Sequence, residues 1–370
     1  MSNKNFKTIF DCGSSKVRAA TFNKHNKNEI FYSESEFFTD QLSLESRIEK
    51  IITSFENDTN EYINSIDLMV DSPKMLSIGI SVSKKLDGSK LRRSNIQFLL
   101  QEAKQQILKY YSNYNIAHII INNYKIDNVD YSNFPDEIEC RFISLDILFI
   151  CLPSDLLKYF KKVFSSYNIL VNQIICSSYA KSINYKSNLD LTSHVSFIDV
   201  GFNKVSIISF FNNSVCSFDV LPIGGNHITK DISKILKMDL NQSEKLKINL
   251  HNSNYKFSND TNFSLDILEN IISARTEEIL ELCKGSLKLN TSMSDHSKII
   301  LMGEGSKIFQ NDHKNEFLLS NEVDFFQETT KDICESGFKF ETVLNKQEVL
   351  VIPKKHTKKG FFEKLFHFFR

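Results

Sequence analysis

The sequence predicts an α/β fold built from two related halves. The pattern apolar-Asp-x-Gly-x-x-Lys-Val occurs at residues 10–17 and again at residues 198–205, an offset of 188 residues (199 minus 11). Both copies continue into β-prone residues. A chain of 370 residues is long enough for two or more domains with a large core.

The composition argues against several classes of protein. Lysine plus arginine total 45 and aspartate plus glutamate total 45, so a general nucleic-acid binder is not expected. The seven cysteines contain no CxxC pair, which argues against a disulfide framework and a zinc site and favours a reducing compartment. No apolar run approaches the roughly 20 residues of a membrane-spanning helix.

Each copy of the repeated pattern is expected to form a strand, a tight turn and a returning strand. Glycine in the turn lets backbone N–H groups face an anion, and the serine hydroxyls of the first copy can add donors. Aspartate at the strand end can hold a water of Mg²⁺. Two such hairpins facing each other would bind a polyphosphate between two domains. The alternative is a pair of ordinary hairpins in a sheet-rich protein.

Further signals follow in the second half. Pro222 and a glycine pair mark a turn, and Thr229 is expected to cap the next helix. Ser243 is expected to begin another helix. On it, Glu244 and Lys247 share one face and could reach a ribose, or else form a solvated ion pair.

A third glycine cluster lies at residues 303–306, where an apolar strand ends and a helix is expected to open. A backbone without side chains could approach a flat base there. Longer helices are expected at residues 94–110, 155–164 and 264–289, the last of them from apolar residues at helical spacing.

In this order, the pieces resemble the actin-like ATPase superfamily, and within it the FtsA family of bacterial cell-division proteins. The resemblance implies an actin-like ATPase fold of two duplicated ribonuclease-H-like halves with an inserted α+β subdomain, 1C. The resemblance also implies a division into subdomains. Residues 1–70 and 325–345 would form the two parts of subdomain 1A, with subdomain 1C at 71–173. Residues 174–242 and 291–324 would form the two parts of subdomain 2A, with a reduced subdomain 2B at 243–290, and a linker at 346–360 would lead to an amphipathic helix at 361–370.

The resemblance also implies a site for ATP and Mg²⁺, with at most weak ATPase activity and no identified catalytic residue. The residues expected at the nucleotide are Asp11, Gly13, Ser14, Ser15, Lys16, Asp199, Gly201, Asn203, Gly225, Glu244, Lys247, Gly303, Gly305 and Ser306. Asp11 and Asp199 would hold Mg²⁺ through water. The second loop departs from the family's Gly-Gly-Gly-Thr, because Phe202, Asn203 and Lys204 follow Gly201. Glu304 stands where glycine is common.

Partners follow from the same resemblance. FtsZ would be recruited through its C-terminal peptide, near Arg275 on the helix expected at 264–289. The alternative for Arg275 is a solvated ion pair with Glu278 or Glu281. Self-assembly into a polymer is expected, at the division septum on the cytoplasmic face of the inner membrane.

The last ten residues predict a membrane anchor independently of the family. At 100° per residue, the apolar residues of 361–370 share one face and the polar ones the other. Lysines precede this segment, and a basic amphipathic helix is typical of the bilayer interface. The apolar residues are Phe361, Phe362, Leu365, Phe366, Phe368 and Phe369. The alternative is a final helix docked on the protein's own core.

Three other functions stay open at this stage. The chain could be a metabolic kinase of the same superfold, although no catalytic base is identified. It could be a pilus-type actin-like adaptor that binds a different peptide. The altered second loop could also mean a pseudo-ATPase without nucleotide.

Overall fold

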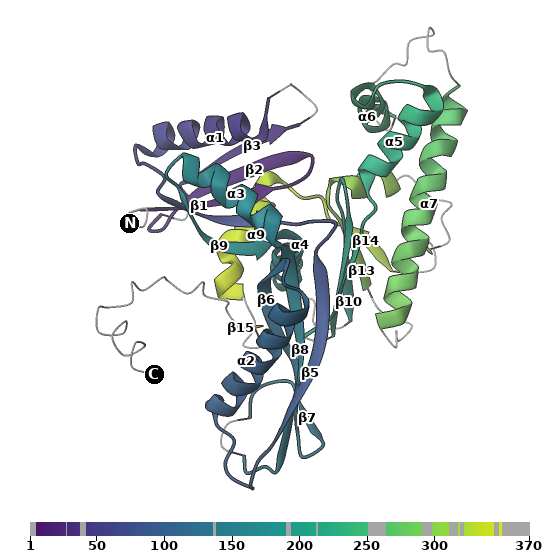
Figure 1. Ribbon diagram of the computed structural model, residues 1–370. Helices are drawn as coiled ribbons and strands as arrows, with labels where there is room; N and C mark the ends of the chain where they lie inside the picture. Colours follow the sequence, from purple (N-terminus) through teal and green to yellow (C-terminus); the bar gives the residue numbers. More distant parts are fainter. Residues whose placement is uncertain are drawn as a thin grey trace.

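The computed structural model describes residues 5–26, 28–37, 42–135, 138–189, 194–211, 214–250, 264–290, 298–310, 317–318, 322–343 and 348–349. These residues form an α/β structure with three sheets (Figure 1). The amphipathic segment at 361–370 and most of the expected linker lie outside the described residues. Within the described residues, no helix is long and apolar enough to span a membrane.

The first half is a sheet with strand order β3-β2-β1-β4-β9. Its elements are β1 (Phe6–Cys12), β2 (Lys16–Asn23), β3 (Ile30–Glu36), α1 (Leu44–Thr59), β4 (Ser65–Val70), α3 (Ser154–Ser166), β9 (Leu170–Cys176), α4 (Ser177–Asn188) and α9 (Thr330–Val343). Phe10 packs against Phe164 of α3, and its neighbour Ile9 lies beside Gly337 of α9. Because adjacent strand residues point to opposite faces, α3 and α9 cover opposite faces of the sheet.

The second half repeats this arrangement, with strand order β12-β11-β10-β13-β14. Its elements are β10 (Val195–Val200), β11 (Val205–Phe211), β12 (Ser214–Leu221), α5 (Gly225–Leu236), α6 (Leu240–Asn249), α7 (Leu265–Asn290), β13 (Lys298–Met302), the 3₁₀ helix η1 (Glu304–Phe309) and β14 (Val323–Phe325). In Figure 1, α5, α6 and α7 stand together on the side away from α1.

The duplication extends to buried side chains. The hydroxyls of Thr8 and Thr21 lie 3.1 Å apart between β1 and β2. At the positions 188 residues later, the hydroxyls of Ser196 and Ser209 lie 2.8 Å apart between β10 and β11. Each half therefore pairs two small hydroxyl residues across its central hairpin, which satisfies polar groups inside a sheet buried on both faces.

The inserted unit is a third, antiparallel sheet with strand order β15-β6-β8-β5 and a core of its own. Its elements are β5 (Leu76–Lys85), α2 (Arg93–Tyr110), β6 (Tyr114–Ile126), β7 (Val129–Tyr131), which pairs with β6, β8 (Phe142–Pro153) and β15 (Glu348–Val349). β15 joins β6 from within the expected linker.

The three longer helices predicted from the sequence are present as α2, α3 and α7, within two residues of the expected ends. Two predicted helix starts are wrong. Thr229 lies inside α5, which begins at Gly225, because the backbone there is bound to the second hairpin. Ser243 lies inside α6, which Asp239 caps by accepting a hydrogen bond from the N–H of Gln242 at 2.9 Å.

The change from the first half to the second does not fall at residue 174. That position is inside β9, which pairs with β4 of the first sheet. The next helix, α4, packs against α9 of the same half. The second half begins with β10, and α4 lies between the two sheets.

Candidate functional site

The two repeated hairpins close with the same turn. The N–H of Gly13 donates to the carbonyl of Lys16 at 3.0 Å, and the N–H of Gly201 donates to the carbonyl of Lys204 at 2.9 Å. A Cβ at either glycine would lie 3.1 Å from that carbonyl oxygen. Glycine therefore lets each turn close tightly, as the sequence predicted for this pattern.

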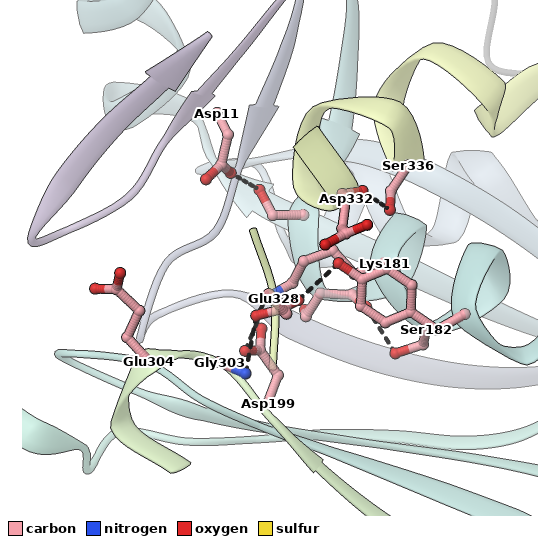
Figure 2. Close-up of polar contacts among 12 residues, drawn as sticks. Asp11, Lys181, Ser182, Asp199, Gly303, Glu304, Glu328, Asp332 and Ser336 are labelled. Atoms are coloured by element: carbon pink, nitrogen blue, oxygen red, sulfur yellow. Dashed lines mark hydrogen bonds and ion pairs between the residues drawn. The ribbon is translucent and has the colours of Figure 1, made fainter. Parts of the chain in front are cut away.

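Both hairpins face one cavity between the halves. It is lined by Asp11, Gly13, Ser14 and Ser15 of the first hairpin and by Asp199, Gly201, Phe202 and Asn203 of the second, and it holds about 90 Å³. The carboxylates of Asp11 and Asp199 point into this region from opposite sides (Figure 2). The structure thus brings together the two strand-end aspartates that the sequence repeat relates.

Two buried lysines occupy the floor of this cavity. The ammonium of Lys181 on α4 lies 3.0 Å from Asp199 and 3.1 Å from Glu328. The ammonium of Lys204 lies 2.9 Å from Asp71 and 3.6 Å from Asp199. Their side chains are about 8% exposed, so these pairs are removed from water.

The electrostatics of the floor follow from these contacts. Burial alone would lower the pKa of Lys181, but the carboxylates of Asp199 and Glu328 raise it above its ordinary value. Burial alone would raise the pKa of Asp199, but Lys181 and Lys204 together lower it. Lys181, Lys204 and Asp199 are accordingly charged at neutral pH.

Asp11, the equivalent of Asp199, has a different environment. Its carboxylate accepts a hydrogen bond from the hydroxyl of Ser177 at 2.7 Å and lies 3.5 Å from the guanidinium of Arg18. Burial raises the pKa of Asp11 more than Arg18 lowers it.

Glu304 lies where the two halves meet above the hairpins. Its carboxylate lies 2.6 Å from the ammonium of Lys16 and 3.0 Å from Arg18, and Lys16 also reaches Glu36. Burial would raise the pKa of Glu304, but Arg18 and Lys16 hold it below its ordinary value. Lys16, expected at a phosphate, is therefore engaged by two carboxylates.

An apolar pocket of about 320 Å³ lies beside the second half, with Val200, Ile228, Ile279 and Phe309 among its lining residues. A neighbouring cavity of about 310 Å³ is lined by Ser15 and Phe202 at one end and by Lys247 and Gly305 at the other. The cavities share lining residues, so they adjoin one another between the hairpins and the apolar pocket.

Glu244 and Lys247 form the predicted ion pair, but the pair is buried. The ammonium of Lys247 lies 2.6 Å from Glu244, donates to the carbonyl of Gly225 at 3.0 Å, and donates to the hydroxyl of Thr229 at 2.9 Å. Burial lowers the pKa of Lys247 below its ordinary value. Both residues line the connecting cavity.

Three glycines let backbone segments meet around the cleft. A Cβ on Gly224 would lie 2.5 Å from the carbonyl oxygen of Gly201. Gly303 has φ +84°, and a Cβ there would lie 2.5 Å from the carboxylate of Asp199. A Cβ on Gly305 would lie 2.8 Å from Val200. The lack of a side chain at these glycines therefore allows close backbone contacts with the second hairpin.

Three further residues are in polar or structural contacts. The hydroxyl of Ser306 donates to the carbonyl of Gly303 at 2.7 Å, so it stabilises its own turn. The side chain of Asn203 accepts from Asn226 at 2.8 Å. Nδ1 of His227 accepts from the N–H of Gly224 at 3.2 Å, which is a structural contact.

Arg275 is already paired. Its guanidinium lies 2.7 Å from Asp231 and 2.5 Å from Glu278, and the side chain is 26% exposed. Glu281 pairs with Lys284 instead. An acidic peptide at Arg275 would compete with two carboxylates of the chain itself.

The sequence did not identify four further polar residues that line the cavity around Asp11, Asp199 and Lys204. Lys181, Asp71, Ser177 and Glu328 come from four separate segments, and no motif links them. Lys204 occupies the lysine position that the two copies of the internal repeat share, and the sequence offered this signal alone for it.

The donor set does not fit the Mg²⁺ expected at Asp11 and Asp199. Both oxygens of Asp199 face ammonium groups, and Asp11 faces Ser177 and Arg18. Mg²⁺ needs oxygen ligands and is repelled by nearby cations. Among the described residues, no group of three or more His, Cys, Asp or Glu side chains could hold a metal ion.

Comparisons with known proteins agree with this architecture. A family model described as cell division protein FtsA matches residues 196–307. FtsA of Buchnera aphidicola subsp. Schizaphis graminum (strain Sg) is 24% identical over 219 residues, 56% of this chain and 51% of that protein. FtsA of Bacillus subtilis (strain 168) is 34% identical over 108 residues, 25% of this chain and 24% of that protein. The chain thus spans about half of one relative and a quarter of the other.

A solved structure, the PilM-PilN type IV pilus biogenesis complex, superimposes with a TM-score of 0.61 at 10% sequence identity, covering 91% of this chain and 93% of that chain. Duplicated sheets around one cleft, together with this likeness, define the class: the chain has an actin-like ATPase fold. Within that class, residues 196–307 match the model of the cell division protein FtsA, and the predicted resemblance to FtsA is confirmed.

Proposed function

We propose that this chain is a cell-division scaffold that binds an adenine nucleotide in the cleft, self-assembles, and recruits FtsZ to the membrane at the septum. The observation that carries the proposal is the single cleft that both Asp-x-Gly hairpins line, in a relative of FtsA. Nucleotide would contact both halves at once, a use of ligand binding typical of hinged domains.

The adjoining cavities support a nucleotide with its base in the apolar pocket. Ligand pockets are mostly apolar with a few polar groups that fix orientation. Lys247 and Glu244 provide such groups between the apolar pocket and the hairpins. Phosphates would then lie toward the glycine turns at residues 13 and 201.

The membrane role rests on residues 361–370, whose Phe-rich face and preceding lysines favour a lipid surface. We expect the full chain to float with vesicles that contain anionic lipid and a variant lacking 361–370 to stay unbound. Glu363→Gln, a change on the polar face, is the matched control and should leave flotation intact. Equal flotation of the truncated chain would contradict the proposed anchor.

The FtsZ role is tested with a peptide of the FtsZ C-terminus in a pull-down. Arg275→Glu should abolish capture, because it places a third negative charge beside Asp231 and Glu278. Lys284→Glu is the control, since it reverses a charge on the same helix, in a weaker pair at 3.4 Å. If both variants capture the peptide as the parent chain does, Arg275 has no part in it.

The pilus-type alternative rests on fold alone, and capture of no FtsZ peptide by the parent chain would favour it. The kinase alternative has no supporting observation in the cleft. Phosphorylation of a small substrate by the purified chain would be needed to revive it.

A further inference from the structure

The carboxylate oxygens at the phosphate end of the cleft are already matched with cations of the chain. One oxygen of Asp199 lies 3.0 Å from the ammonium of Lys181, and the other lies 3.6 Å from the ammonium of Lys204. Lys204 also pairs with Asp71, and Lys181 with Glu328 (Figure 2 shows Lys181, Asp199 and Glu328). A divalent ion at Asp199, bound directly or through water, would compete with these ammonium groups for the same carboxylate oxygens.

These ion pairs are too deeply buried for water to screen them. The side chains of Asp199 and Glu328 are 6% and 3% exposed, and that of Asp71 is 12% exposed. Removing one member of a buried pair leaves an uncompensated charge, which is strongly unfavourable. The lysines therefore hold their places against a competing metal.

The same lysines connect the two halves. Lys181 lies on α4, whereas its partner Asp199 is on β10 of the second sheet. Lys204 belongs to the second hairpin, whereas Asp71 follows β4 of the first sheet. The two lysines therefore link the halves across the cleft, a role that a metal bound to phosphate would otherwise have.

The ammonium groups can also bind phosphate. Each carries three N–H donors, and a hydrogen bond between charged groups is stronger than a neutral one. The ammonium of Lys204 already meets Asp71, Asp199 and the hydroxyl of Ser206, so a phosphate would share its donors with these groups. Lys181, Lys204 and Arg18 line the small cavity together with the two glycine turns. A phosphate entering there would meet three cations before any metal.

We propose that Lys181 and Lys204 are the resident cations of this cleft in place of Mg²⁺, so that an adenine nucleotide binds there without a divalent metal. The proposal rests on the proposed nucleotide function. It assigns to two side chains of the protein the charge neutralisation and bridging that the family resemblance assigned to a metal ion.

Titration calorimetry of the full parent chain with ADP and ATP, in excess EDTA and in excess Mg²⁺, tests the proposal without any variant. We expect the two dissociation constants for each nucleotide to differ by less than about tenfold. Tighter binding by tenfold or more with Mg²⁺ would overturn the metal-free site and leave the nucleotide function standing. No binding in either condition would overturn both.

A variant that removes one cation and one acid sharpens the result. Lys181→Met with Glu328→Gln leaves Asp199 paired with Lys204 alone, so affinity in EDTA should fall about tenfold, equivalent to one charge-assisted hydrogen bond. Mg²⁺ should then restore part of it. The matched control is Lys331→Met with Glu335→Gln on α9, which removes one cation and one acid outside the cleft and also frees Lys339 from Glu335, and it should bind as the parent chain does.

Unchanged affinity of the cleft variant in EDTA, in a chain that keeps the parent's circular dichroism, would show that Lys181 does not bind the nucleotide and would overturn its assignment. If the variant does not fold, the titrations of the parent chain still decide the question.

Discussion

The two hairpins have the same backbone and different charges. Lys16 and Lys204 are equivalent, because both close the turn of the repeat. Lys16 reaches Glu304 of the second half, and Lys204 reaches Asp71 of the first half. The lysine of each hairpin thus forms an ion pair with an acid of the opposite half.

The two acids are themselves equivalent. Met69 lies opposite Asp11 in the first sheet, and Met302 lies opposite Asp199 in the second. Two residues further along, these strands lead to Asp71 and Glu304. The cross-cleft ion pairs are therefore related by the internal duplication, although one is buried and the other is partly exposed.

This comparison shows that the duplication preserved a reciprocal contact while the environment of each copy diverged. Arg18 sits beside Asp11, whereas the equivalent position beside Asp199 is Ser206, which accepts a hydrogen bond from Lys204. The cations beside Asp199 are instead Lys204 of the turn and Lys181 of α4. Four predictions follow the difference from its largest effect to its smallest.

Lys204→Met should produce the largest loss of stability. It leaves Asp71 and Asp199 buried with one cation fewer, and breaking a buried pair costs about 3 kcal/mol or more. Urea denaturation of the full chain measures the change. A loss below about 1 kcal/mol, the range of exposed pairs, would show that the buried pair contributes little.

Asp199→Asn and Asp11→Asn should have different effects on the free energy of unfolding. The pKa of Asp199 is lowered from 3.8, so its carboxylate contributes stability above that pH which is lost as the pH falls through the lowered value. The pKa of Asp11 is raised from 3.8, so its contribution is present below 3.8 and is lost as the pH rises through the raised value.

At pH 7 we therefore expect Asp199→Asn to cost about 2 kcal/mol, from the loss of hydrogen bonds between charged groups. Asp11→Asn should be neutral or stabilising, since its side-chain oxygen can still accept from Ser177. Urea midpoints measured from pH 7 to below pH 3.8 compare the two variants across both titrations. Equal losses for both would contradict the assigned environments.

Gly303→Ala should cost about 1 to 2 kcal/mol, because the residue has φ +84° and its Cβ would meet the carboxylate of Asp199. Gly79→Ala in β5 is the control, since a Cβ there meets nothing within 4 Å. Denaturation midpoints measure both. A cost for Gly79→Ala as large as that for Gly303→Ala would remove the close contact as the cause.

Lys16→Met should have the smallest effect, below about 1 kcal/mol, because Glu36 and Glu304 are 42% and 38% exposed and water screens the pair. Raising the salt concentration should reduce the difference between this variant and the parent chain further. A loss equal to that of Lys204→Met would show that the two hairpins are energetically alike.

The sequence indicated the elements with strong local signals. The repeated pattern at the two hairpins, the apolar spacing of α7, and the glycine clusters are all local features, and each has its counterpart in the structure. The starts of α5 and α6 were mispredicted. Backbone contacts with the second hairpin decided one, and Asp239 provided an earlier cap for the other.

The helix α4 shows why the rest was hidden. Its residues from Ser177 to Lys186 are all buried, although the helix is rich in serine, asparagine and lysine. A polar helix is ordinarily read as exposed. Here its small polar residues pack between the halves: the hydroxyl of Ser177 donates to Asp11, and the side-chain NH₂ of Asn184 donates to Ser336.

The sequence by itself determined the duplicated α/β architecture, the two glycine turns and the likeness to FtsA, because these depend on residues close together in the chain. Only the tertiary structure decided which cations and acids meet in the cleft. Asp71, Lys181 and Glu328 lie far apart in sequence, and the energy of a charge pair depends on distance and burial, which folding alone sets.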